Sequence, residues 1–196
     1  MPGSPQPTVL ILASGRGERF IASGGTGSKL QAMLLGKTVL QHTVDAVRAS
    51  GLPFHVEAGP HPGMGDSISA AVRATPDAAG WLVLPGDLPL IQPATLQVVA
   101  DALTDHAAVF PTFEGQRGHP VGFSAQCAAA LEALKGNQGA APVLAAHRAI
   151  ELVVFDSGTV IDIDTLDDLY RIAQQLAANA QHLHSVDSVR AIARKS

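Results

Sequence analysis

The sequence has little of what disulfide-linked, membrane-spanning and nucleic-acid-binding proteins need. A single cysteine, Cys127, excludes an internal disulfide framework, and its alanine-rich surroundings predict a packing role in a helix. No run of about 18 apolar residues is present, so we expect no membrane span. The formal net charge of −4 provides no broad basic surface for DNA or RNA. Small anionic substrates stay compatible with this charge if local cations or a metal ion bind them.

The composition that remains is that of a globular protein. Hydrophobic residues make up 46% of the chain and charged residues 15%. The length of 196 residues is enough for one α/β domain with a sizeable core. Residues 1–7 have neither a basic start nor an apolar segment, so we expect a flexible N-terminal tail and not a signal peptide. The default expectation is a cytoplasmic protein that binds neither membrane nor nucleic acid.

Strand-like and helix-like patterns alternate along the chain. Short apolar runs predict strands at residues 9–12, 54–57, 81–84, 107–110, 121–123, 152–155 and 160–163. Helical spacing predicts helices at residues 38–49, 66–74, 93–103, 125–134, 140–147 and 165–178. This alternation favours a mostly parallel sheet with helices on both faces, in one domain over residues 8–180. Residues 181–196 are expected to form a short helix or tail.

Ligands of such sheets bind beyond the carboxyl ends of the strands, so the residues that follow each strand are the first candidates. The first strand runs into a loop with two glycines and two arginines, Ser14-Gly15-Arg16-Gly17-Glu18-Arg19, and Lys29 comes ten residues after Arg19. Glycines let the backbone approach an anion, and fixed positive charge suits a triphosphate. The same pattern also fits an ordinary strand-to-helix turn. A dinucleotide fingerprint fits less well, because Phe20 replaces its third glycine.

Carboxylates follow two other expected strands. Asp87 stands in Pro85-Gly86-Asp87, and Asp162 and Asp164 stand at the end of the last strand. Carboxylates from separate strand ends can converge on a hard cation such as Mg²⁺. Each aspartate taken singly also fits a turn or a helix cap. Together with the glycine and arginine loop, on one rim of the sheet, they suggest nucleotidyl transfer.

Five segments in order resemble the MobA-like nucleotidyltransferases, and most closely their molybdenum cofactor cytidylyltransferase (MocA-type) branch. The resemblance spans about residues 8 to 175. It rests on the Leu-Ala-Ser-Gly-x-Gly-x-Arg-Phe loop with its later lysine, on Gly63-Met64-Gly65-Asp66-Ser67-Ile68, on the stretch around Pro85-Gly86-Asp87, on Gly118-His119-Pro120 and on the stretch from Asp162 to Leu169.

The resemblance implies a Rossmann-like, three-layer fold of the nucleotide-diphospho-sugar transferase type. It implies transfer of a nucleoside monophosphate from an NTP to a phosphorylated acceptor, with Mg²⁺ as cofactor and release of pyrophosphate. CTP and molybdopterin are the expected substrates. A GTP-using reaction, a sugar- or polyol-phosphate acceptor and a non-catalytic nucleotide-binding accessory protein are the alternatives. A transient contact with a molybdoenzyme or a cofactor chaperone also fits.

The resemblance also implies roles for individual residues. Arg19 and Lys29 would hold the triphosphate, and Asp87 would bind Mg²⁺ with Asp162 and Asp164. His119 would lie on the acceptor side. The residues that would bind the nucleotide are Leu12, Ala13, Ser14, Gly15, Gly17, Arg19, Lys29, Gly63, Met64 and Ser67.

The chain departs from the family pattern at three places. The loop between Arg19 and Lys29 is longer than usual, which makes the position of Lys29 a question for the structure. The stretch Gly136-Asn137-Gln138-Gly139-Ala140-Ala141 lacks the family's acid and arginine. Leu166 replaces a proline at the start of the expected last long helix, which is a small change.

Overall fold

The computed structural model describes residues 6–15 and 17–178. Most of the expected N-terminal tail and all of the expected C-terminal segment 181–196 lie outside these residues. No helix in the described part of the chain is long and apolar enough to cross a membrane. In chain order, the elements are β1 (Thr8–Leu12), α1 (Glu18–Ala22), η1 (Lys29–Gln31), β2 (Met33–Leu34), β3 (Lys37–Thr38), α2 (Val39–Ser50), β4 (Phe54–Glu57), α3 (Met64–Arg73), β5 (Gly80–Pro85), α4 (Pro93–Ala102), β6 (Ala108–Phe113), β7 (Gln116–Arg117), β8 (Val121–Ser124), η2 (Ala125–Cys127), α5 (Ala128–Glu132), α6 (Ala141–Ala146), β9 (Ile150–Val153) and η3 (Ser157–Thr159). A further helix covers residues 166–178.

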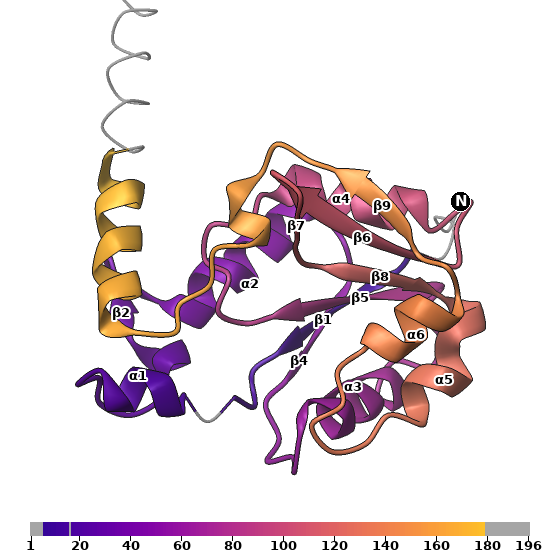
Figure 1. The fold of residues 1–196 in the computed structure, drawn as a ribbon, viewed down its shortest axis with the longest axis horizontal. Coiled ribbons are helices and arrows are strands. Elements are labelled where there is room, and N and C mark those ends of the chain that lie inside the picture. The colour runs from indigo at the N-terminus through magenta and orange to yellow at the C-terminus, as the bar shows by residue number, and fades with distance from the viewer. Residues whose placement is uncertain (1–5, 16, 179–196) are drawn as a thin grey trace, which may run out of the picture.

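The central sheet has seven strands in the order β4-β1-β5-β8-β6-β7, with β9 paired to the other edge of β6 (Figure 1). Strands β4, β1 and β5 run parallel, and so do β6 and β9. Strand β8 runs antiparallel to both β5 and β6, which leaves β5 and β6 pointing the same way. The sheet is therefore mostly parallel, as predicted. The carboxyl ends of β1 and β5 lie together at one edge.

Side chains that alternate along the strands divide the core into two layers. Val9 and Ile11 of β1 pack into the cluster under α2 and α4. Leu10, between them, packs into the cluster under α3 and α5, where Cys127 is also buried. This period-2 alternation is what a sheet buried on both faces requires. It confirms the predicted three-layer α/β fold and the packing role of the cysteine.

A third apolar cluster lies beside the carboxyl ends of the strands. Phe20 of α1, Leu30 of η1, Leu34, Val39, Ile163 and Ile172 are all buried in it. The cluster joins the long loop after β1 to the helix over residues 166–178, far away in sequence (Figure 1). Phe20 and Leu30 therefore anchor the two ends of the stretch between Arg19 and Lys29, while residues 21–24 and 26–28 are exposed.

The helix over residues 166–178 begins as the sequence predicts. The Thr165 hydroxyl accepts a hydrogen bond from the Asp168 backbone N–H at 3.2 Å, and the Asp168 carboxylate accepts one from the Thr165 N–H at 2.9 Å. This is a capping box with Asp in the place of Glu or Gln. The Ser23 hydroxyl accepts the Leu166 N–H at 3.0 Å, so the long loop itself satisfies one of the helix's free donors.

The predicted strand over residues 160–163 is wrong. Val160 and Ile161 donate backbone hydrogen bonds back to Ser157, which continues the turn of η3. The Ile163 N–H donates to the Asp87 carbonyl at 3.2 Å, so the segment meets the end of β5 at one point without forming a ladder. Its apolar pattern includes Ile161 and Ile163, which both pack in the third cluster. Asp162 and Asp164 thus lie on a loop and not at a strand end.

Candidate active site

One cavity of about 800 Å³ opens beyond the carboxyl ends of β1 and β5. This size is typical of small-molecule sites. Among the predicted site residues, the following line it: Leu12, Ser14, Gly15, Gly17, Arg19, Lys29, Gly63, Met64, Ser67, Asp87, His119, Asp162 and Asp164. Ala13 does not line the cavity; it packs against the third cluster and donates its N–H to the Glu57 carbonyl at 2.8 Å.

Three aspartates gather in this cavity. Asp87, Asp162 and Asp164, here called the acid cluster, each offer a carboxylate oxygen within 4.8 Å of the other two. Asp87 follows β5 directly, and the Gly86 N–H before it donates to the Leu12 carbonyl of β1 at 2.9 Å. A Cβ at Gly86 would lie 3.1 Å from that carbonyl, so glycine lets the two strand ends approach closely. The three aspartates therefore lie close together in the cavity, as the sequence predicts.

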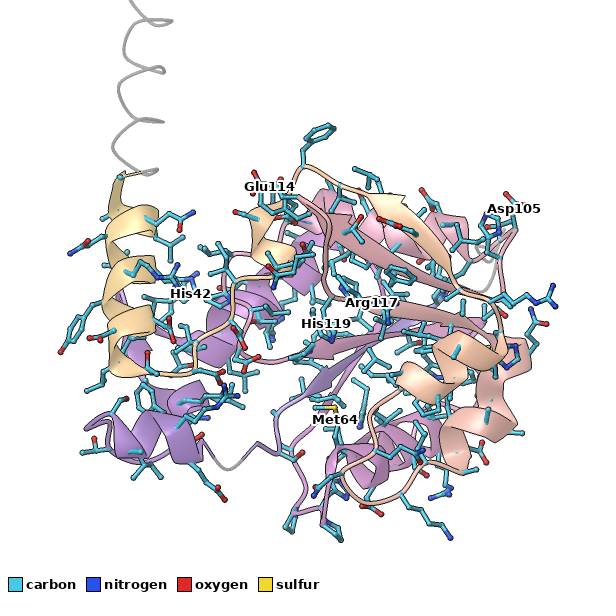
Figure 2. All side chains as sticks on the ribbon, viewed as in Figure 1. His42, Met64, Asp105, Glu114, Arg117 and His119 are labelled. Atoms are coloured by element: carbon cyan, nitrogen blue, oxygen red, sulfur yellow. The ribbon has the colours of Figure 1, made fainter. Side chains whose placement is uncertain are left out.

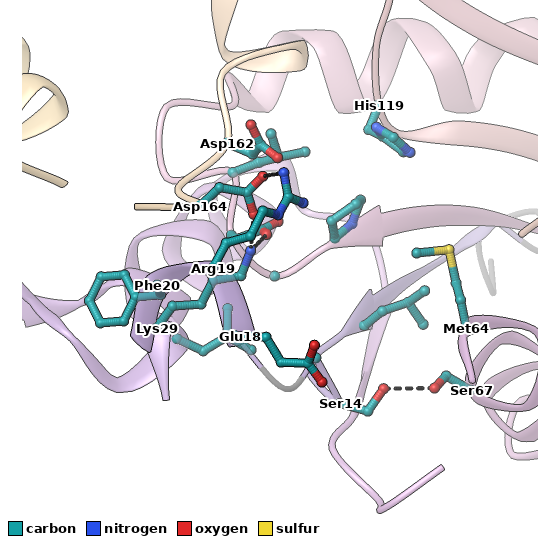
Figure 3. Close-up of a pocket in the computed structure, with 18 of the residues that line it drawn as sticks. Ser14, Glu18, Arg19, Phe20, Lys29, Met64, Ser67, His119, Asp162 and Asp164 are labelled. Atoms are coloured by element: carbon teal, nitrogen blue, oxygen red, sulfur yellow. Dashed lines mark hydrogen bonds and ion pairs between the residues drawn. The ribbon is translucent and has the colours of Figure 1, made fainter. Parts of the chain in front are cut away.

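The cations of the loop after β1 lie against the acid cluster (Figure 3). The Lys29 ammonium contacts the carboxylates of Asp87 and Asp164, at 2.7 Å each. The Arg19 guanidinium contacts the other oxygen of Asp164 at 2.6 Å. The longer loop therefore still brings Lys29 into the cavity, because Phe20 and Leu30 on either side of it are anchored in the third cluster.

Burial and neighbouring charge shift the pKa of Lys29 in opposite directions and the pKa of Asp162 in the same direction. Burial lowers the pKa of Lys29, but the Asp87 and Asp164 carboxylates outweigh it and leave the Lys29 pKa above its usual value. Partial burial, together with the charges of Asp164 and Asp87, raises the pKa of Asp162. The acid cluster therefore contains more negative charge than its surroundings accommodate easily, and it attracts cations.

A divalent metal ion fits this donor set. The Asp87 Oδ1 atom is buried and has no hydrogen-bond partner among the described residues. A buried carboxylate oxygen without a partner costs free energy, and an additional cation would satisfy it. Carboxylate oxygens are the ligands that Mg²⁺ and Mn²⁺ prefer. The residues that could hold such an ion are Asp87, Asp162 and Asp164.

The start of α3 forms another part of the wall. Gly63 and Gly65 lie so close to the chain at residues 135–138 that a Cβ at Gly63 would come 2.1 Å from the Gly136 carbonyl group. The Gly65 N–H donates to the Gly136 carbonyl at 2.8 Å, and Asp66 accepts the Gly136 N–H at 2.7 Å. These contacts hold segment 135–138 against the start of α3, and Asn137 of that segment lines the cavity. Met64, which is half exposed, lines the cavity itself.

The glycine loop and α3 also meet through their serines. The hydroxyls of Ser14 and Ser67 are 2.7 Å apart, and Ser67 also donates to the Gly63 carbonyl at 3.2 Å (Figure 3). Both serines line the cavity, where their hydroxyls can donate to or accept from a bound molecule. The sequence predicted each serine singly, and the structure brings the two together.

A further wall consists of Gln116, Arg117, His119, Thr159 and Val160, here called the β7 wall. The Thr159 carbonyl accepts the His119 backbone N–H at 2.9 Å, which fixes the two segments against each other. Burial lowers the pKa of His119, although the nearby Asp87 opposes the shift. Figure 2 labels Arg117 and His119 over the centre of the sheet. Arg117 is not among the site residues predicted from the sequence, although Arg117 stands two residues before the predicted His119.

Comparison with known proteins gives a family and a fold. The MobA-like NTP transferase domain family matches residues 46–150, which is more than half of the chain. Among curated proteins, none matches this chain significantly in sequence.

Several solved structures share the fold. Rv0371c from Mycobacterium tuberculosis H37Rv superposes with a TM-score of 0.75 and 25% identity, over 86% of this chain and 98% of that chain. A manganese complex of Rv0371c superposes with a TM-score of 0.70, at the same identity and coverage. Molybdopterin-guanine dinucleotide biosynthesis protein A from Archaeoglobus fulgidus superposes with a TM-score of 0.65 and 20% identity, over 88% of this chain and 99% of that chain.

Proposed function

This chain belongs to the MobA-like NTP transferase domain family, and we propose that it transfers CMP from CTP to molybdopterin, with Mg²⁺ as cofactor and pyrophosphate as the second product. That the chain is a nucleotidyltransferase follows from the family. The base of the NTP, the acceptor and the metal are the parts that we add. The resemblance of the motifs to the MocA-type branch supports CTP and molybdopterin.

The observation that carries the proposal is the pairing of charges in the cavity. Lys29 lies between two carboxylates of the acid cluster, and Arg19 lies against one of them. A triphosphate and a divalent ion would replace these pairs by equivalent ones, with phosphate oxygens on the cations and the ion on the carboxylates. The cavity therefore already contains both charges that an NTP–metal complex needs.

The reaction needs positioning more than it needs a reactive side chain. An acceptor phosphate monoester is largely deprotonated near neutral pH, because its second pKa is about 6. One of its oxygens forms the new bond to the α-phosphorus of the NTP, and the bond from that phosphorus to the bridging oxygen of the β-phosphate breaks. The electron pair leaves with pyrophosphate. Arg19 and Lys29 hold the phosphates in line and stabilise the charge that develops on them.

The acid cluster completes this arrangement. Asp87, Asp162 and Asp164 would hold the Mg²⁺, which supplies charge neutralisation at the phosphate oxygens. Ser14, Gly15, Gly17, Gly63, Met64 and Ser67 would surround the nucleotide, and His119 would face the acceptor.

Pyrophosphate release tests the proposal. The purified protein is incubated with CTP, GTP, ATP or UTP, with and without Mg²⁺, and with molybdopterin, a sugar 1-phosphate or a polyol phosphate. We expect release that needs CTP, Mg²⁺ and molybdopterin together, with a product heavier than the acceptor by one CMP residue. Preference for GTP, or turnover only with a sugar or polyol phosphate, would contradict the assignment of substrates. Tight nucleotide binding without turnover on any acceptor would contradict catalysis.

A further inference from the structure

The negative charge of the acceptor needs a counter-charge that the acid-cluster side does not offer. Lys29 and Arg19 are already engaged with carboxylates there, and in the proposed reaction they serve the triphosphate. A phosphate monoester dianion that approaches the α-phosphorus also meets the repulsion of the other phosphates. A second cation on the acceptor side would reduce this repulsion. Among the residues of the β7 wall, Arg117 has a permanent positive charge.

Arg117 is held in place by an aromatic ring and not by an acid. Its guanidinium carbon lies 4.1 Å from the centre of the Phe110 ring, which is close for a cation–π contact. Arg117 pairs with Thr112 across the β6–β7 hairpin, and Phe110 lies two residues before Thr112 on the same face of β6. Stacking on a ring orients the guanidinium plane but leaves its N–H donors free to bind an anion.

No carboxylate of the described residues forms an ion pair with Arg117. Glu151 of β9, which pairs with Phe110 in the sheet, accepts a hydrogen bond from the Thr112 hydroxyl at 2.8 Å instead. The neighbouring carboxylate is thereby engaged elsewhere. Arg117 is exposed and lines the cavity, so an anion can reach it.

We propose that Arg117, stacked on Phe110, binds the phosphate of the acceptor and makes the enzyme specific for phosphorylated acceptors. This inference rests on the proposed function, because transfer to a phosphate monoester supplies the dianion that Arg117 binds. A guanidinium recognises phosphate with two parallel hydrogen bonds, which a lysine ammonium does not reproduce. Arg117 is thus a specificity residue on the β7 wall, separate from the residues that bind the triphosphate.

Binding of phenyl phosphate, a simple phosphate monoester, tests this inference without turnover. The α,β-methylene analogue of CTP is bound first with Mg²⁺, so that no bond to the α-phosphorus can break. Broadening of the phenyl proton signals then reports the affinity for phenyl phosphate, with phenol as the uncharged comparison. We expect Arg117→Gln to weaken phenyl phosphate binding on the order of tenfold to a hundredfold and to leave phenol binding and the CTP analogue unaffected.

Further variants separate charge, geometry and folding. Arg117→Lys keeps the charge but loses the fork, so we expect it to recover only part of the affinity. Phe110→Leu keeps an apolar side chain and removes the ring face, for which we expect about a twofold to fivefold loss. Arg48→Gln is the matched control, because Arg48 lies 5.8 Å from the Phe54 ring and does not line the cavity. It should change nothing.

The outcomes distinguish this inference from the proposed function. Wild-type protein that does not bind phenyl phosphate, or an Arg117→Gln variant that binds it normally, would overturn the inference. So would an equal loss of affinity for the CTP analogue, which would place Arg117 on the triphosphate side. Arg117→Gln could selectively lose phenyl phosphate binding while the wild-type protein shows no turnover with molybdopterin. That result would support the inference and contradict the proposed acceptor.

Discussion

The two sides of the cavity differ in what contacts their positively charged side chains. On the acid-cluster side, Lys29 lies 2.7 Å from each of two carboxylates, and its side chain is only 12% exposed. On the β7 wall, Arg117 has no carboxylate partner among the described residues and stacks on Phe110. On the first side, the cations and carboxylates are paired with each other, and a nucleotide and a metal ion can replace these partners. The second presents a free cation to an anion that arrives without a metal.

The difference predicts which ligands depend on one another for binding. Lys29 occupies the carboxylates that a metal ion needs, so the ion alone competes with an internal ammonium. A triphosphate that brings its own metal ion offers Lys29 new partners at the same time. The acceptor phosphate meets no such competition at Arg117. Binding of nucleotide and metal should therefore be strongly coupled, whereas acceptor binding at the β7 wall depends on one exposed contact.

The largest predicted effect comes from removing a carboxylate of the acid cluster. Asp87→Asn keeps the size of the side chain but removes its charge, and it should lower turnover at least ~10²-fold because the transition-state charge is no longer neutralised. The measurement is pyrophosphate release with CTP, Mg²⁺ and molybdopterin. Asp45→Asn, in an exposed pair with Lys37, is the control and should retain activity. Near-normal turnover in Asp87→Asn would remove the acid cluster from the mechanism.

Lys29→Gln should change metal and nucleotide binding in opposite directions. Without the ammonium between Asp87 and Asp164, the affinity for Mn²⁺ alone should rise about tenfold, because the carboxylates are left uncompensated. The affinity for CTP should fall, because the triphosphate loses a cation. Electron paramagnetic resonance of free Mn²⁺ measures the first quantity and calorimetry the second. Unchanged or weaker Mn²⁺ binding would show that Lys29 does not compete for this site.

Arg19→Gln should have a smaller effect. The Arg19 side chain is 77% exposed, so solvent weakens its pair with Asp164 and that pair adds little to the local charge balance. We expect less than about a twofold change in Mn²⁺ affinity and a loss of CTP affinity of about threefold to tenfold. The same two titrations measure both. A change in Mn²⁺ affinity as large as that of Lys29→Gln would mean that the two cations act as one unit.

Salt should produce the smallest effect and should separate the two sides of the cavity. Between 0.1 M and 1 M NaCl the screening length falls from about 10 Å to about 3 Å, and exposed charges lose most. The ratio of phenyl phosphate affinities between the wild type and Arg117→Gln should shrink about twofold to threefold. The effect of Lys29→Gln on Mn²⁺ affinity should change less, because that group is nearly buried. Equal salt sensitivity on both sides would contradict the contrast in exposure.

Much of the fold could be predicted because its elements are local. The strand over Phe54–Glu57 and the helix that ends before Gly51 follow from apolar spacing and from a glycine in the left-handed conformation. The prediction of a strand over residues 160–163 was wrong because Ile163 packs in the third cluster and not in the sheet. The short β2–β3 and β7 strands were missed because two residues carry no periodic signal.

The site was predictable where its chemistry follows the strand ends and less so elsewhere. Asp87 follows β5, as the sequence predicts, and the structure adds that it forms an ion pair with Lys29. The role of Gly63 and Gly65 in packing against residues 135–138 depends on a contact between segments far apart in sequence. Arg117 was not predicted because its partner, Phe110, lies across a hairpin that the sequence pattern does not indicate. Proximity to the Gly118-His119-Pro120 motif was the one available signal.

Steady-state kinetics with CTP and molybdopterin varied independently tests the contrast between the two sides most directly. For Lys29→Gln, we predict a raised KM for CTP and a nearly unchanged KM for molybdopterin. Arg117→Gln should give the converse, a raised KM for molybdopterin with a nearly unchanged KM for CTP. If both variants raise the same constant, or if each raises both equally, the two sides of the cavity do not bind different substrates and the account is contradicted.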